Sequence, residues 1–192
     1  MSTQNKYFDL SDDMRIPGRW VLSQLDIDDR GRPMDPWQFD QGKVLHLEGV
    51  QLIGVGHPGN ALDFSLTELS TPVVSSRVVS VFERLALQDE VQFIPARVEG
   101  QSQPYFILNT LQIFRCIDDA RCEEVLYWQP EDGRPDKLGK YRNVVGLKVD
   151  PARVDGANIF RPWGWTVALI VSERLKRAME AEGITGTRFI EA

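Results

Sequence analysis

The stretch IFRPWGWTVALIVSERL, residues 159–175, carries the clearest pattern in the chain. Trp163 and Trp165 flank a glycine, which predicts a tight turn, and the aliphatic residues that follow predict a strand. Ser172 is placed to cap the helix that comes next. Tryptophans beside a sheet usually pack, because each buries a large area, and Arg161 is the polar group available to face a ligand. We therefore interpret this stretch as strand, turn, strand and helix that build the core.

A similar pattern occurs earlier in the chain. Residues 74–96 and 171–192 share Val-Ser-x-Arg-aliphatic, then Phe or Met followed by Glu, then Phe-Ile-x-Ala. Both segments predict a capped helix followed by a short strand; coincidence in a frequent capping pattern is the alternative. Arg77 and Arg174 lie in the first helical turn, where the helix dipole disfavours a cation. We therefore expect each arginine to have a specific partner.

The remaining apolar segments favour strands over helices. Residues 105–118 form the longest strand candidate, and the chain lacks the regular strand-helix alternation of a parallel doubly wound sheet. The sequence predicts an α+β fold in which helices pack against a mostly antiparallel sheet, with two similar helix-strand units at 74–96 and 171–192. We expect residues 1–40 to be a variable N-terminal region packed on one domain, residues 41–192.

Composition excludes several classes of protein. The chain has 192 residues, 42% of them hydrophobic, and a net charge of −6. Nucleic acid is a poor partner for this charge, because phosphate binding needs a basic face. No window approaches the roughly 18 apolar residues of a membrane span, and the first residues lack the apolar core of an export signal. We expect a cytoplasmic protein whose two cysteines, Cys116 and Cys122, are reduced thiols.

Residues able to carry catalysis are sparse. His46 and His57 are the two histidines, and the metal-ligand spacings that a zinc site requires are absent. Nucleophile-elbow and phosphate-loop motifs are absent as well. We therefore predict no catalytic residue, no cofactor and no metal. An enzyme with a dispersed site, pairing His57 with Asp63 or Asp118 with Glu123, remains the alternative.

An acidic segment is the candidate for partner binding. Residues 111–136 hold seven acids and three bases, whereas residues 137–160 hold five bases and two acids. Adjacent carboxylates usually form a solvated surface, but four acids beside two aromatic residues also have the composition of a patch that binds a basic protein. The predicted partner-binding residues are Asp118, Asp119, Glu123, Glu124, Tyr127 and Trp128.

Several segments together resemble a known family. They are PVVSSR from residue 72, FIPARV from 93, YFILNTLQIFRCID from 105, NIFRP from 158 and VALIVSERLKRAMEAEGITGTRF from 167. The most specific are Ile159–Arg161 and Val171–Phe189. Over residues 40–192 the chain resembles the myxobacterial-type immunity domain of bacterial polymorphic toxin systems, long a domain of unknown function.

The resemblance implies a non-catalytic, cytosolic α+β protein. Such a protein would bind a cognate toxin encoded beside it, one to one, and neutralise it. A nuclease toxin would fit the charge, because nucleases are basic and an acidic inhibitor at −6 complements them. An adaptor, or an inhibitor of another secreted protein such as a protease, is the second alternative.

Overall fold

The computed structural model describes residues 6–25, 27–28 and 30–192, and most of its strands form two five-stranded sheets. Sheet I has the order β14 (Thr187–Glu191), β1 (Tyr7–Asp12), β13 (Ile170–Ser172), β12 (Ile159–Pro162) and β9 (Ile113–Phe114). Sheet II has the order β3 (Gln51–Ile53), β7 (Val91–Val98), β8 (Tyr105–Thr110), β6 (Pro72–Ser75) and β5 (Phe64–Leu66).

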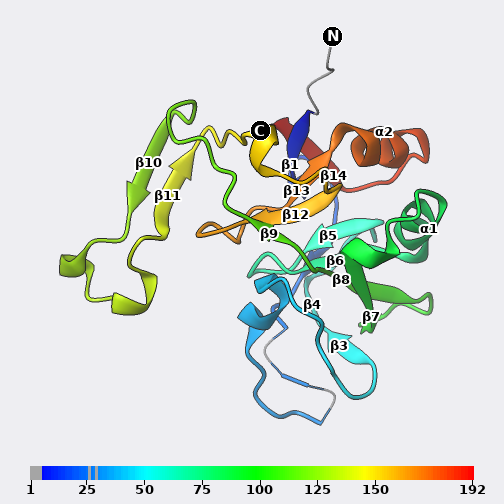
Figure 1. The fold of residues 1–192 in the computed structure, drawn as a ribbon. Helices are drawn as coiled ribbons and strands as arrows, with labels where there is room; N and C mark the ends of the chain where they lie inside the picture. The colour runs from blue at the N-terminus through cyan, green and yellow to red at the C-terminus, as the bar shows by residue number, and fades with distance from the viewer. Residues whose placement is uncertain (1–5, 26, 29) are drawn as a thin grey trace.

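Two helices and two strand pairs complete the fold. The helices are α1 (Ser76–Arg84) and α2 (Glu173–Ala181), and the pairs are β2 (Val21–Leu22) with β4 (Val55–His57) and β10 (Glu124–Tyr127) with β11 (Tyr141–Val145). Short 3-10 turns lie at Pro36–Asp40, Gln88–Glu90, Pro130–Asp132, Pro135–Lys137 and Pro151–Arg153. In Figure 1 both helices lie on one side of the stacked sheets, and β10 and β11 project from the other side.

Both large sheets are mixed, which corrects the prediction of a mostly antiparallel sheet. In sheet I, β9 runs parallel to β12, and in sheet II, β3 runs parallel to β7. Residues 105–118 were predicted as one strand but form β8 in sheet II and β9 in sheet I. The chain leaves one sheet and enters the other at residues 111–112, and apolar residues are needed on both sides of that crossing. The mixture of helix and strand is as predicted.

The two similar sequence segments occupy equivalent places in the two sheets. Strands β6 and β7, joined through α1, flank β8, and strands β13 and β14, joined through α2, flank β1. The equivalent cross-strand pairs are Ser75–Tyr105 and Ser172–Tyr7, Val74–Phe106 and Val171–Phe8, and Phe93–Leu108 and Phe189–Leu10. The fold therefore contains one unit twice, and the N-terminal strand β1 supplies the middle strand of the C-terminal unit.

The two helices are tied to each other by the arginines of their first turns. Arg77 Nη2 donates a hydrogen bond to the carbonyl of Glu182, which ends α2, at 2.6 Å. Arg174 Nη2 donates to the carbonyl of Leu85, which ends α1, at 3.0 Å. Each cation thus satisfies an orphan carbonyl at the negative end of the other helix. The expectation of a specific partner for each arginine is confirmed.

Apolar residues form three clusters around this framework. The largest lies between the sheets and the helices and includes Leu10, Leu108, Phe82 and Met179. A second cluster surrounds Trp20 and covers the outer face of sheet II. The third lies against the outer face of sheet I and includes Phe160, which is fully buried. The prediction that residues 159–175 contribute to the core is therefore confirmed for Phe160.

Candidate partner-binding site

Residues 118–148 form an arm that projects from the body (Figure 1). It contains the β10–β11 hairpin and two 3-10 turns, and it leaves and rejoins the body through the bridge between Ile117 and Val149. Both bridge residues are buried, whereas none of residues 118–148 is. A two-stranded hairpin without a buried face is marginally stable by itself. The arm therefore depends on contacts at its base.

Asp118 and Arg121 fix the start of the arm. The amide of Asp118 donates to the carbonyl of Lys148 at 2.8 Å, and Arg121 Nε donates to the Asp118 carboxylate at 2.6 Å. Arg121 Nη2 also donates to the carbonyl of Val149 at 2.6 Å. The hydrogen bond from Arg121 lowers the pKa of Asp118. Asp118 is thus committed to an internal ion pair.

Asp119 organises the side of the arm that faces the body. Its carboxylate accepts hydrogen bonds from the hydroxyls of Tyr127 and Tyr141, the latter at 2.6 Å, and the two rings lie 4.8 Å apart between centroids. Burial, reinforced by Asp119, raises the pKa of Tyr141. The amide of Tyr141 also donates to the carbonyl of Gly164 at 3.1 Å, which joins the arm to the turn after β12.

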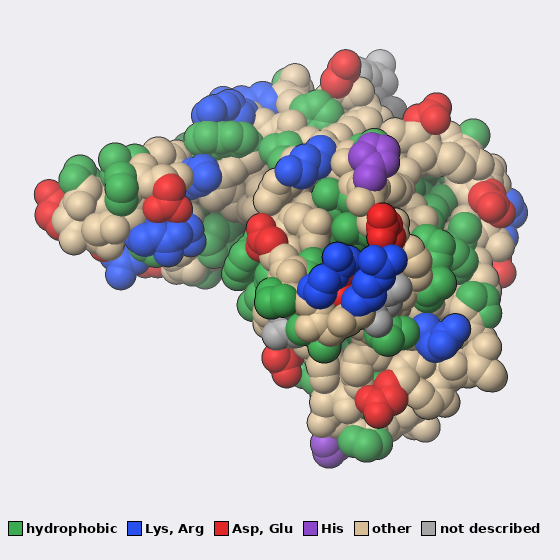
Figure 2. All heavy atoms as spheres, turned by 90° about the horizontal axis from the view of Figure 1, so that it is seen from below, with side chains coloured by type: hydrophobic (Ala, Val, Ile, Leu, Met, Phe, Trp, Pro, Cys, Tyr) green, Lys and Arg blue, Asp and Glu red, His purple; other side chains and the backbone are tan. Residues whose placement is uncertain are grey.

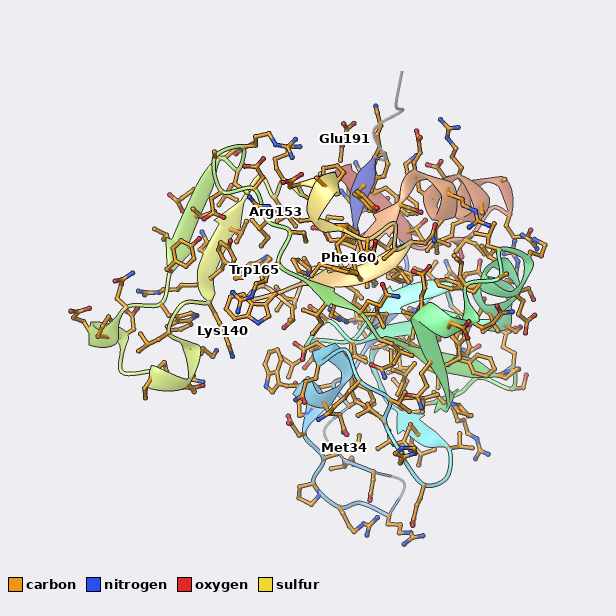
Figure 3. All side chains as sticks on the ribbon, in the orientation of Figure 1. Met34, Lys140, Arg153, Phe160, Trp165 and Glu191 are labelled. Atoms are coloured by element: carbon orange, nitrogen blue, oxygen red, sulfur yellow. The ribbon has the colours of Figure 1, made fainter. Side chains whose placement is uncertain are left out.

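Gly164 is required where the arm meets this turn. Its φ is +82°, a conformation that side chains rarely adopt, and an added Cβ would lie 3.1 Å from the ring of Tyr141. The glycine between the two tryptophans therefore allows both the turn and the close approach of the arm. Trp165 is half-buried against the third cluster, and Figure 3 shows it on the side of the body that faces the arm.

The structure divides the predicted partner-binding residues into two groups. Asp118, Asp119 and Tyr127 line one cavity at the base of the arm. The other three do not line it: Glu124 accepts a hydrogen bond from Asn143 at 3.2 Å, Glu123 lies against Gly146, and Trp128 lies under Lys137 and Arg142.

Opposite charges are interleaved over the arm. The hairpin brings Arg142 of the basic half to Asp132 of the acidic half at 2.7 Å, and Arg134 pairs with its near neighbour Asp136 at 2.9 Å within the acidic half. Figure 2 accordingly shows acidic, basic and hydrophobic side chains side by side on the arm. Three of the seven acids in residues 111–136 thus form ion pairs with arginines, namely Asp118, Asp132 and Asp136.

The cavity between arm and body has a volume of about 510 Å³. Sequence reasoning missed four of the side chains that line it: Arg115, Tyr141, Arg153 and Trp163. The guanidinium of Arg115 lies 3.3 Å from the centroid of the Trp163 ring. Arg153 lies near the junction of arm and body (Figure 3) and pairs with Asp150 at 3.1 Å. Trp163, expected to pack in the core, instead contributes to this surface.

A family comparison decides the class of the protein. The model of an immunity protein family, Imm11, matches residues 4–192. The chain belongs to the Imm11 immunity protein family. The resemblance identified over residues 40–192 is thereby confirmed and extends to β1 and the rest of the N-terminal region. A search of curated proteins finds no similar sequence. Membership in Imm11 indicates a toxin-neutralising immunity protein.

Asp63, proposed for an alternative enzymatic site, has a structural role in this Imm11 chain. The carboxylate of Asp63 accepts hydrogen bonds from Ser75, Thr185 and Arg77 at 2.7–3.0 Å, so it holds α1 and the loop after α2 together. His57 is exposed in β4, outside the described cavities.

Among the residues that the structure describes, no group of three or more His, Cys, Asp or Glu side chains is arranged to hold a metal ion. Within the same residues, neither helix has the length and apolarity to cross a membrane.

Proposed function

We propose that this protein neutralises a cognate toxin by binding it with the arm and with the cavity at the arm's base. The observation that carries the proposal is the arm's exposure. Leu126, Leu138 and Val145 are 48%, 46% and 41% exposed on an element with no buried residue. Exposed apolar side chains on a projecting element favour a protein interface, because a partner that covers them removes apolar surface from water.

Neutralisation would follow from occlusion. A projecting arm can enter the active-site cleft of a toxin or block its substrate path while the compact body remains outside. Such a mechanism requires no bond to be made or broken by the immunity protein, so we propose that it is not an enzyme. The toxin would be encoded next to it and bound one to one in the cytoplasm.

We further propose a nuclease as the class of toxin. The support is the net charge of −6, which complements a basic protein and accelerates its association. Glu123 and Glu124, together with Trp128, would contribute from outside the cavity. Asp118, Asp119 and Tyr127 would act through the shape of the cavity, because their polar groups are engaged internally.

Co-expression provides the first test. The neighbouring gene is expressed alone and together with this protein, and growth is followed. We expect toxicity of the neighbour alone, rescue by co-expression and a one-to-one complex on gel filtration. Deletion of the arm should abolish rescue, and a nuclease assay on the purified neighbour tests its chemistry. A neighbour that is harmless, or toxic despite co-expression, overturns the proposal.

A further inference from the structure

Among the arginines that the structure describes, Arg115 is set apart by its surroundings. Most others make ion pairs or hydrogen bonds, whereas the guanidinium of Arg115 makes neither with any described residue. Arg97 and Arg188 also make no such bond, but they lie on exposed strand positions away from the described cavities. Arg115 is the unpaired arginine that lines the cavity at the base of the arm.

The other charged side chains of this cavity already have polar partners. Asp118 is paired with Arg121 at 2.6 Å, and Arg153 is paired with Asp150 at 3.1 Å. The carboxylate of Asp119 accepts hydrogen bonds from two tyrosine hydroxyls. What remains without a partner is the positive charge of Arg115 and its N–H donors. The unused hydrogen-bonding capacity among these charged side chains is therefore that of the Arg115 guanidinium, which suits an anion.

Trp163 holds this cation in place. The guanidinium lies 3.3 Å from the centroid of the indole ring, a cation–π contact that fixes the plane of the group. The backbone of Trp163 is fixed next to that of Arg115 as well, because the amide of Trp163 donates to the carbonyl of Phe114 at 2.7 Å. An arginine held flat on a ring keeps its outer N–H edge available for a planar carboxylate, at little further cost in side-chain entropy.

From these contacts we infer that Arg115 is an anchor for the toxin: it binds an aspartate or glutamate side chain that enters the cavity between arm and body. The inference rests on the proposed function and specifies which chemistry of the toxin meets this surface. Tyr127, Tyr141 and Trp163 surround the anchor, and tyrosine, tryptophan and arginine are the residues that most often dominate binding energy at interfaces. The toxin, although basic as a whole, would thus present an acidic group at this point.

The test is a comparison of two charge reversals. Arg115→Glu and the control Arg97→Glu change the net charge equally, and both positions are exposed. Affinity for the purified product of the neighbouring gene is measured by titration calorimetry at two salt concentrations. We expect Arg115→Glu to weaken binding about 30-fold or more, and Arg97→Glu to change it less than about threefold. The affinity of Arg115→Lys should lie between those of wild type and Arg115→Glu, because lysine keeps the positive charge but lacks the planar pair of N–H donors that binds a carboxylate.

The outcomes separate the inference from the proposed function. If wild type binds the neighbour and both reversals weaken binding equally, the inference is wrong while the proposed function stands. The inference is also wrong, and the proposed function stands, if Arg115→Glu strengthens binding. That result would indicate that a basic group of the toxin enters the cavity and pairs with Asp119. If wild type does not bind the neighbour, the proposed function fails and the inference falls with it. Equal melting temperatures of the two variants exclude a folding defect as the cause.

Discussion

Replacement of residues 119–147 by Asn-Gly should leave the body folded and remove toxin binding. The cut is geometrically possible because the amide of Asp118 already bonds to the carbonyl of Lys148 at 2.8 Å, and Ile117 bridges Val149 beneath them. An Asn-Gly pair forms the type I′ turn that closes two antiparallel strands. The deletion removes no buried side chain.

The expected change in the free energy of unfolding is small because two effects oppose each other. Loss of the half-buried Leu147 and of the hydrogen bonds from Tyr141 to Gly164 and from Arg121 to Val149 costs about 3 kcal/mol. Closing a loop of two residues instead of roughly 30 returns about 2 kcal/mol of chain entropy. We therefore expect the melting temperature to change by less than about 5 °C.

Thermal unfolding followed by circular dichroism shows whether the body stays folded. Calorimetric titration with the neighbouring gene product shows whether toxin binding is lost. A fall of more than about 15 °C would show that the arm stabilises the body, contrary to its exposure. A deleted protein that melts normally and still binds the toxin would refute the assignment of the arm as the interface.

Three further predictions concern the core, the pH dependence and the outer charges. Phe160→Ala should lower the free energy of unfolding in urea by ~3–5 kcal/mol, and Trp165→Ala by less, because Phe160 is fully buried and Trp165 is half-buried; equal losses would contradict this packing. Burial raises the pKa of Asp9 from 3.8 to about 6 in the folded protein, so folding takes up a proton and stability should rise by ~1–3 kcal/mol as the pH falls through about 6 towards 3.8; Asp9→Asn should abolish this rise in urea unfolding measured between pH 7 and 5. Reversal of Glu123 and Glu124 to lysine should slow association with the toxin several-fold at low salt without changing the melting temperature; an unchanged association rate in stopped-flow mixing would remove both from the interface.

Local patterns allowed part of the fold to be predicted from the sequence. Ser75 and Ser172 cap helices as expected, because a serine oxygen satisfies backbone amides wherever a helix begins. The pairing of β1 with β13 and β14 was not predicted. The Tyr-Phe-x-Leu pattern that begins at residue 105 follows the helix of its unit in the sequence, whereas the same pattern at residue 7 precedes the helix of its unit. A pattern search that reads units in linear order does not find a permuted strand.

The candidate site was only partly predictable for a related reason. The acids and aromatics of residues 118–128 are close in sequence, so their composition gave a signal, and three of them do line the cavity. Arg115 and Trp163 gave none, because a single arginine in an apolar segment becomes distinctive only when a distant turn places an indole ring beneath it. The assignment of a contact surface to Glu123, Glu124 and Trp128 stays a prediction.

The permuted repeat has a consequence for the order in which the protein can assemble during synthesis. The unit that contains α1 and β8 is complete in the first 110 residues and can fold as soon as they emerge. Strand β1 is made before the other strands that the structure describes, yet both strands that flank it lie within residues 170–192. Phe8 and Leu10 therefore remain outside a sheet until residues 170–192 have been made. A chain that stops before residue 170 would lack both partners of β1, so only molecules that contain β13 and β14 can complete sheet I beside the arm.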